Sequence, residues 1–212
     1  MLASHRGFDR GALPLARRLA RRFEAELFAA TASRLLVDLN RSPRHPGCFS
    51  RYTRGLPEAE RRRILERHYW PHRRRVERAV VRAGAGGGRV LHLAVHSFTP
   101  VRRGERRRVD VGLLYDPARA AERALCARLA ELLEEEAPAL RVRRNFPYRG
   151  RSDGLTTSLR RLHPARRYLG IELEVSQRFF RAGRGPRERL GRALESALVR
   201  LLDESRAPGA PW

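Results

Sequence analysis

The sequence contains no lysine: all 46 of its basic residues are arginine. Alanine, leucine, glycine and proline are also frequent, a pattern typical of GC-rich codon usage, in which arginine accumulates on solvated surfaces. The net charge of +23 invites a nucleic-acid interpretation, because positive surfaces attract phosphates. However, the arginine runs 61–63, 73–75 and 106–108 lack interleaved aromatic residues that would stack on bases. We expect only nonspecific charge attraction, and a basic nucleic-acid-binding protein remains the rival class.

Cysteine is scarce as well, and Cys48 and Cys126 have no CxxC spacing. Two isolated thiols indicate neither a disulfide framework nor a zinc knuckle. No apolar run is long enough to cross a membrane, and Met1 to Gly7 hold no signal-peptide core. Dinucleotide and P-loop glycine patterns are also missing, because Gly84–Gly88 precedes a predicted strand rather than a helix. Because the sequence shows neither a signal-peptide core nor an apolar run of membrane length, we expect a cytoplasmic protein that does not bind membranes.

The chain has 212 residues, of which 42% are hydrophobic, enough for one domain with a sizeable core. Predicted helices alternate with predicted strands, which favours an α/β fold with a mixed or parallel sheet flanked by helices. We expect one domain over residues 1–205 and a flexible tail over 206–212. The predicted helices are 9–28, 57–83 (kinked or divided by Pro71), 117–137 and 187–202, and the predicted strands are 33–39, 109–115, 140–144, 168–175 and a run from 90 into 96–100.

The strand that begins at Val90 carries the most informative residue, His96. The apolar run predicts a buried strand that emerges at the carboxyl edge of the sheet, where α/β proteins usually place their chemistry. A histidine at that edge can bind a metal or move a proton. The alternative is a histidine that is simply satisfied and partly buried. The predicted strand 33–39 ends similarly at Asn40–Arg41, which either presents an amide and a guanidinium to an anion or forms a surface turn.

Two carboxylates mark the last predicted strand. Glu172 and Glu174 are two residues apart, so the pleat places them on the same face, and burying them is costly unless they are paired or functional. Asn145 opens a long polar loop that runs to residue 156, and such loops are often functional. Asp9 either caps the first predicted helix or joins this group. A possible metal ligand, a carboxylate base and an arginine together suggest a hydrolase.

Five segments, in this order along the chain, resemble the N-formylglutamate amidohydrolases, a family related in fold to the zinc carboxypeptidases and aspartoacylases. His-Ser-Phe at 96–98 is similar to the carboxypeptidase His-Ser-Tyr that carries the last zinc ligand. Asp-Leu-Asn-Arg at 38–41 is similar to the substrate-carboxylate segment of aspartoacylases. The resembling segments are Ser4–Ala12, Leu36–Ser42, Val95–Pro100, Asn145–Tyr148 with Asp153–Gly154, and Leu169–Gln177.

The resemblance implies a zinc-dependent hydrolase that cleaves the amide bond of a small N-acyl amino acid. His96 would then be a zinc ligand and Asp9 a second one. Glu174 would be the general base, with Glu172 the alternative. Arg41, helped by Asn40, would clamp the substrate carboxylate. Ser97 and Asn145 would be further substrate-binding residues.

The family pattern also has a strand and a Cys-Glu-His-Gly-like motif ahead of the segment that begins at Ser4, and its histidine would be the first zinc ligand. That motif does not precede Ser4 in this sequence. We therefore expect either a start site further upstream or a catalytically silent relative that keeps the fold. His5 is the candidate substitute ligand, because catalytic zinc sites usually have three protein ligands.

Overall fold

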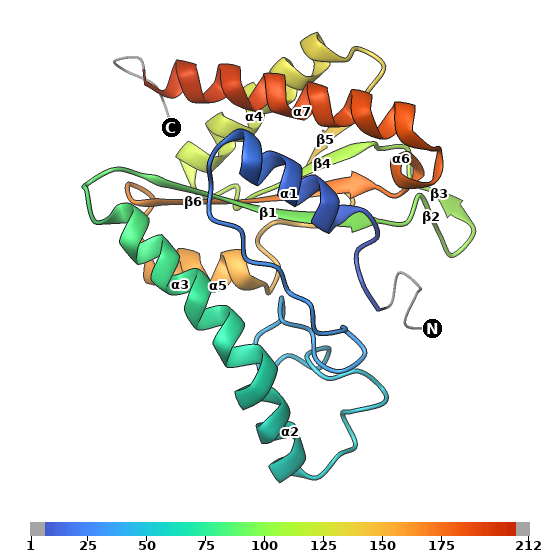
Figure 1. Cartoon of the computed structure of the whole chain (residues 1–212), viewed down its shortest axis with the longest axis vertical. Coiled ribbons are helices and arrows are strands. Elements are labelled where there is room, and N and C mark those ends of the chain that lie inside the picture. The colour runs from blue at the N-terminus through green and yellow to red at the C-terminus, as the bar shows by residue number, and fades with distance from the viewer. Residues whose placement is uncertain (1–6, 207–212) are drawn as a thin grey trace.

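A four-stranded sheet forms the centre of the structure, a computed structural model that describes residues 7–206 (Figure 1). The strand order is β1 (Val90–Phe98), β6 (Tyr168–Ser176), β4 (Val111–Leu114) and β5 (Val142–Arg144). β1 lies parallel to β6, β6 antiparallel to β4, and β4 parallel to β5. The predicted α/β fold with a mixed sheet is confirmed.

Helices cover both faces of the sheet (Figure 1). One layer contains α1 (Ala12–Arg22), α4 (Ala120–Glu136) and α7 (Arg184–Ser205), and the other contains α3 (Trp70–Gly84) and α5 (Leu155–Leu162). The remaining elements lie at the margins: α2 (Glu58–Ile64), the π-helical turn η1 (Leu65–Tyr69), the two-residue strands β2 (Val101–Arg102) and β3 (Glu105–Arg106), and α6 (Arg178–Arg181).

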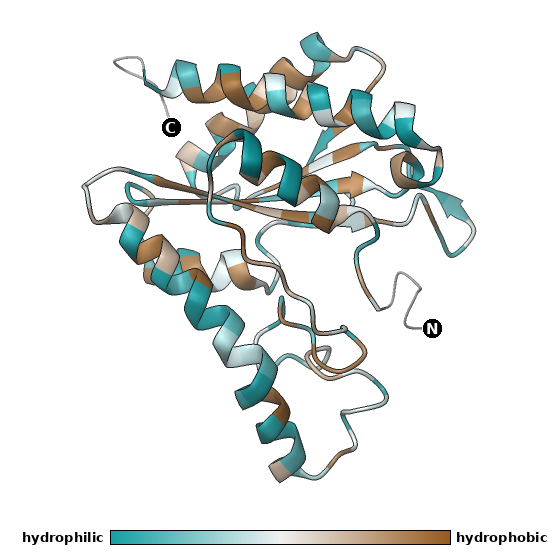
Figure 2. Ribbon diagram, in the orientation of Figure 1, coloured by the Kyte–Doolittle hydropathy of each residue, from teal (hydrophilic) through white to brown (hydrophobic). Residues whose placement is uncertain are grey.

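The side chains of β6 divide between the two layers, as its alternation requires. Leu169, Ile171, Leu173 and Val175 join the main core with buried residues of α1, α4 and α7. Tyr168, on the opposite face, packs with side chains of α3 and α5. Much of the ribbon of β1 and β6 is accordingly hydrophobic (Figure 2). Glu172 and Glu174 share the face of Tyr168, so they point toward the layer of α3 and α5.

The predicted strand 33–39 is wrong, because this segment forms turns and irregular structure. Its backbone bonds to a neighbouring loop instead of a sheet: the Asp38 N–H donates to the Cys48 carbonyl at 2.7 Å, and the Thr53 hydroxyl donates to the Leu36 carbonyl at 2.8 Å. The apolar residues of the segment fill a separate small cluster with Tyr69. These apolar side chains are therefore buried against a neighbouring loop and not in the sheet.

Two predicted helices also differ from the structure. The first begins at Ala12 and ends at Arg22, so residues 23–28 are not helical. In the second, the chain passes from α2 through η1 into α3, and Pro71 lies in the first turn of α3. A π-helical turn widens the hydrogen-bond ladder by one residue, and here it ends at Tyr69, two residues before Pro71, which donates no hydrogen bond.

The burial of β1 is the reverse of the prediction. Residues 90–96 are half-buried, and Ser97 and Phe98 at the carboxyl end are buried. The reason is that β1 is an edge strand with a single neighbour, β6. The sequence also predicts no helix after the long loop that begins at Asn145, whereas the structure has α5, which begins at Leu155 near the end of that loop.

No helix within residues 7–206 is long and apolar enough to cross a membrane. Arg206, the first residue of the predicted tail, is the C-cap of α7. The rest of the predicted tail, 207–212, and His5 lie outside the described residues.

Candidate functional site

His96 and Asp9 form a direct contact at the carboxyl end of β1. His96 Nδ1 lies 2.8 Å from Asp9 Oδ2. The residue that caps α1 is Gly11, without a side-chain hydrogen bond, so the capping interpretation of Asp9 is wrong. The Ser97 hydroxyl donates to the Arg10 carbonyl at 2.8 Å, which fixes the segment before α1 against β1 and holds Asp9 beside His96.

Arg34 joins this pair and was not among the predicted site residues. Its Nη2 lies 2.7 Å from Asp9 Oδ2 and 3.4 Å from His96 Nδ1. The Arg34 backbone N–H donates to the Gly7 carbonyl at 3.2 Å, so segments 7–10 and 33–34 lie side by side. The only signal in the sequence was an arginine in the segment that leads to Asn40, and the predicted strand concealed it.

The carboxylate of Asp9 stabilises positive charge on both His96 and Arg34. Burial disfavours the charged imidazole, but the hydrogen bond and charge of Asp9 outweigh it and raise the pKa of His96 to about 9. Burial likewise acts to raise the pKa of Asp9, yet the hydrogen bond with His96 and the charges of His96 and Arg34 hold that pKa below its usual value. The contact with Asp9 therefore favours the charged form of the imidazole, beside a carboxylate and a guanidinium.

Glu174 is next to His96 because the parallel register pairs the two residues across β1 and β6. Its Oε2 is buried and has no hydrogen-bond partner among the described residues. Burial raises the pKa of Glu174 to about 7. On the other side, β4 pairs Glu174 with Gly112, where a Cβ would clash with the Phe146 carbonyl oxygen.

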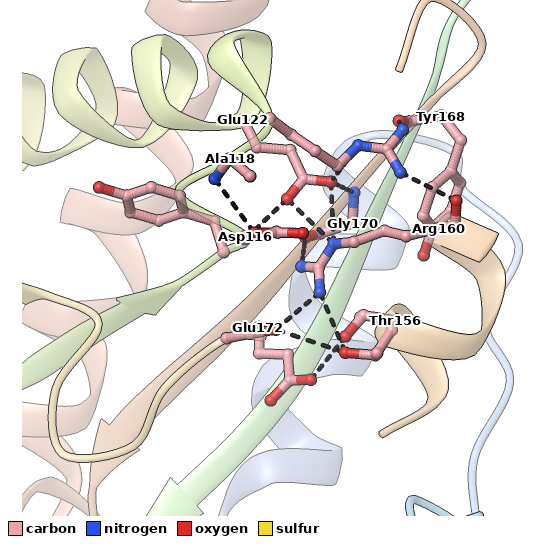
Figure 3. A network of polar contacts seen from close by, with 12 residues as sticks. Asp116, Ala118, Glu122, Thr156, Arg160, Tyr168, Gly170 and Glu172 are labelled. Atoms are coloured by element: carbon pink, nitrogen blue, oxygen red, sulfur yellow. Dashed lines mark hydrogen bonds and ion pairs between the residues drawn. The ribbon is translucent and has the colours of Figure 1, made fainter. Parts of the chain in front are cut away.

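Glu172 has a different environment, although it lies on the same face. Its Oε1 accepts a hydrogen bond from the Thr156 hydroxyl at 2.7 Å (Figure 3). α5 supplies Thr156 and is itself anchored by Arg160, whose Nε lies 3.0 Å from both carboxylate oxygens of Glu122 (Figure 3). The two carboxylates therefore have different surroundings: the Thr156 hydroxyl donates to Glu172, whereas Glu174 Oε2 is buried with no hydrogen-bond partner in the described part of the chain.

The predicted substrate-binding residues are distributed over two regions. Asn40 Oδ1 accepts a hydrogen bond from the Leu155 N–H at 2.8 Å. A Cβ placed on Gly154 would lie 3.3 Å from Glu172 Oε1 and 3.4 Å from Asn40 Oδ1, so these two side chains border one spot. Arg41 Nη1 donates to the Asp153 carbonyl at 2.7 Å.

Asn145 and Ser97 also have structural partners. Asn145 Oδ1 accepts from the backbone N–H groups of Tyr115 and Gly150 at 3.1 and 3.0 Å, so it organises the loop after β5. Ser97 Oγ accepts from Gln177 Nε2 at 3.2 Å. Gln177, which is buried, is a second site residue that sequence reasoning did not single out.

Two cavities are lined by residues of this site. One, of about 540 Å³, is lined by Asp9, Arg34, Ser97 and Gln177 together with arginines and aromatic residues of neighbouring loops. The other, of about 560 Å³, is lined by His96 and by mainly apolar side chains of α1, α3 and β1. Both volumes are in the range of small-ligand sites. The polar cavity is the better candidate for an anionic substrate, because most of its charged side chains are arginines.

The chemistry of His96 and Asp9 suits zinc, but the described residues do not complete a zinc site. Within residues 7–206, no group of three His, Cys, Asp or Glu side chains is placed to hold a metal ion. His96 Nδ1 and Asp9 Oδ2 also face each other, with Arg34 on the same carboxylate oxygen. Zinc binding, and the part of His5 in it, stay predictions.

The arginines bear on the rival interpretation. Each α-helix of the described residues carries arginine, in both helical layers. Many of them form ion pairs with glutamate, as Arg18 does with Glu188 and Glu195. This spread favours an origin in codon usage over a dedicated nucleic-acid surface.

The fold and this site define a class of α/β protein in which an imidazole, two carboxylates and a guanidinium converge on the end of an edge strand. The chain belongs to the N-formylglutamate amidohydrolase family, whose sequence profile matches residues 1–181. No curated protein matches the chain.

The solved structures that resemble this one include two that align with nearly its whole length. The gene product Atu2144 from Agrobacterium tumefaciens is 30% identical, with a TM-score of 0.78 over 97% of this chain and 82% of that one. The N-formylglutamate amidohydrolase from Ralstonia eutropha JMP134 is 22% identical, with a TM-score of 0.70 over 92% of this chain and 82% of that one. The second likeness shows the shared fold.

Proposed function

We propose that the protein hydrolyses the amide bond of an N-acyl amino acid of the N-formylglutamate type. The products are the free amino acid and the carboxylate of the acyl group. The observation that carries this proposal is the position of Glu174, whose unpartnered buried oxygen lies on the strand next to His96. Membership of the amidohydrolase family supplies the reaction type.

Glu174 is the proposed general base. It accepts a proton from the attacking water, whose oxygen bonds to the acyl carbon, and it passes that proton to the nitrogen as the C–N bond breaks. Arg34 is the proposed electrophile, because its guanidinium lines the cavity beside Asp9 and His96 and can stabilise negative charge on the carbonyl oxygen. Glu172, held by Thr156, is the weaker candidate for the base.

The proposed carboxylate clamp is Arg41 with Asn40. Both lie close to loop 153–155, since Arg41 bonds to Asp153 and Asn40 to Leu155. The guanidinium of Arg41 would bind the substrate carboxylate through charge-assisted hydrogen bonds. Ser97 and Asn145 support the site by fixing the segment before α1 and the loop after β5, respectively.

Zinc, when bound, would lower the pKa of its water and polarise the acyl carbonyl. His96 and Asp9 are the proposed ligands among the described residues. Since these residues offer no third ligand, a catalytically silent protein is the second candidate function. Metal analysis separates the two: about one tightly held zinc per purified chain contradicts the silent alternative, and a metal-free, inactive chain supports it.

The decisive experiment compares Glu174→Gln with Glu172→Gln in the hydrolysis of N-formyl-L-glutamate, measured as release of formate and glutamate. Loss of a general base lowers kcat by about 10²- to 10⁴-fold, so we expect that loss for Glu174→Gln. Glu172→Gln should be much less affected, because the amide can still accept the Thr156 hydroxyl. A wild-type protein without activity, or a larger loss in Glu172→Gln, contradicts the assignment.

A further inference from the structure

Arg107 is held between two aromatic rings at the wall of the polar cavity. Its guanidinium carbon lies 5.6 Å from the centre of the Phe98 ring and 5.1 Å from that of Tyr148. Nη1 lies 3.2 Å from the Tyr148 hydroxyl and 3.4 Å from the Thr99 carbonyl oxygen, to which it donates. In the segment 101–108, Arg107 alone is half-buried and the other residues are exposed. Its side chain is thus fixed against the protein.

This guanidinium has no carboxylate partner in the described part of the chain. No Asp or Glu of residues 7–206 forms an ion pair with Arg107, and its bonds to described residues use Nη1, which leaves Nε and Nη2. Arginine binds carboxylates through two parallel N–H groups of its planar fork. A fork that is already immobilised loses little entropy when an anion binds.

The surrounding cavity has an excess of positive charge. Asp9 and Asp38 are its acidic residues, and both already have partners: Asp9 contacts His96 and Arg34, and Asp38 Oδ1 accepts the Asn40 N–H at 2.9 Å. The lining arginines outnumber them; they are Arg34, Arg51, Arg54, Arg102 and Arg107. Such a cavity favours a ligand with more than one negative group.

We propose that Arg107 is a specificity-determining residue that binds the substrate's side-chain carboxylate. This carboxylate is separate from the one assigned to Arg41. The inference rests on the proposed function, since the cavity that contains Arg107 also contains Asp9, Arg34 and Ser97. It predicts that the protein selects a side-chain carboxylate over an amide of the same shape.

The test compares N-formyl-L-glutamate with N-formyl-L-glutamine, which replaces the side-chain carboxylate by a neutral amide. Binding is measured by calorimetry and turnover as kcat/KM, for wild type and Arg107→Gln. Loss of a hydrogen bond to a charged group corresponds to a factor of about 10 to 100. Arg107→Gln should weaken the glutamate compound by that factor and leave the glutamine compound nearly unchanged. Arg107→Lys should lie between, because it keeps the charge without the fork.

Arg106→Gln, an exposed neighbour on β3, is the matched control and should change neither ligand. Equal loss for both ligands in Arg107→Gln, or no loss for either, overturns the inference. Arg107-dependent binding without any hydrolysis overturns the proposed function and leaves the inference standing. Failure of the wild type to bind or hydrolyse either compound overturns both.

Discussion

Replacing Arg160 by methionine should destabilise the fold strongly, because its guanidinium is the centre of a buried polar network (Figure 3). The Arg160 side chain is 5% exposed and that of its partner Glu122 is fully buried. Besides Glu122, the guanidinium donates to the Gly150 carbonyl at 2.6 Å and to the Gly170 carbonyl. Methionine fills much of the space but leaves the carboxylate of Glu122 and two carbonyl oxygens without these partners.

Removing one member of a buried ion pair costs about 3–5 kcal/mol, because the other charge stays buried and unpaired. Glu122 keeps a longer ion pair with Arg119, whose Nε lies 3.5 Å from Oε1, and two backbone donors, the N–H groups of Asp116 and Gly170 at 3.0 Å. These partners favour the lower end of that range. For a chain of this size, each kcal/mol lowers Tm by about 2–4 °C. We therefore expect Arg160→Met to lower Tm by at least about 6 °C.

The assays are thermal unfolding, which gives Tm, and urea denaturation, with the midpoint and slope fitted for each variant. Arg63→Met is the control, because Arg63 forms an exposed pair with Glu60 on α2, and its midpoint should stay close to that of wild type. In a double-mutant cycle, adding Glu122→Gln to Arg160→Met should cost less than it does alone. A midpoint for Arg160→Met within error of the Arg63→Met control would refute the reasoning.

Three further predictions follow from single residues. Gly112→Ala, which places a methyl group against a backbone carbonyl beside Glu174, should cost about 1–3 kcal/mol of stability and reduce hydrolysis. Gly55→Ala, with no neighbour within 4 Å, should do neither. The pKa of Asp110 is lowered because hydrogen bonds from two arginines outweigh its burial. Its contribution to the free energy of unfolding is therefore present above about pH 4 and lost as the pH falls through its folded pKa, so acid titration should destabilise wild type more than Asp110→Asn. His96→Ala should abolish both hydrolysis and zinc uptake; activity that survives this change contradicts the metal assignment.

Much of the fold was predictable, because each element depends on a short local pattern. β6 is a buried strand with Glu172 and Glu174 on one face, as its period of two requires. The run 33–39 failed for a physical reason: an apolar segment shows that it is buried but not whether a neighbouring strand is available for its hydrogen bonds. α5 was missed at the end of a polar loop, where the bonds from Arg160 to Glu122 and from Leu155 to Asn40 stabilise it through contacts distant in sequence.

The candidate site was predictable in its residue types and not in its partners. The sequence alone determined that a histidine ends one strand, that two glutamates share a face of another, and that an aspartate precedes the first helix, since these are properties of neighbouring residues. Only the tertiary structure decided that Asp9 contacts His96, 87 residues away, and that Arg34 joins them. It also gave the two carboxylates different surroundings, because α5 brings Thr156 to Glu172, whereas Glu174 Oε2 is buried with no partner among residues 7–206. Such choices depend on how distant segments pack, and no local pattern in the sequence encodes that packing.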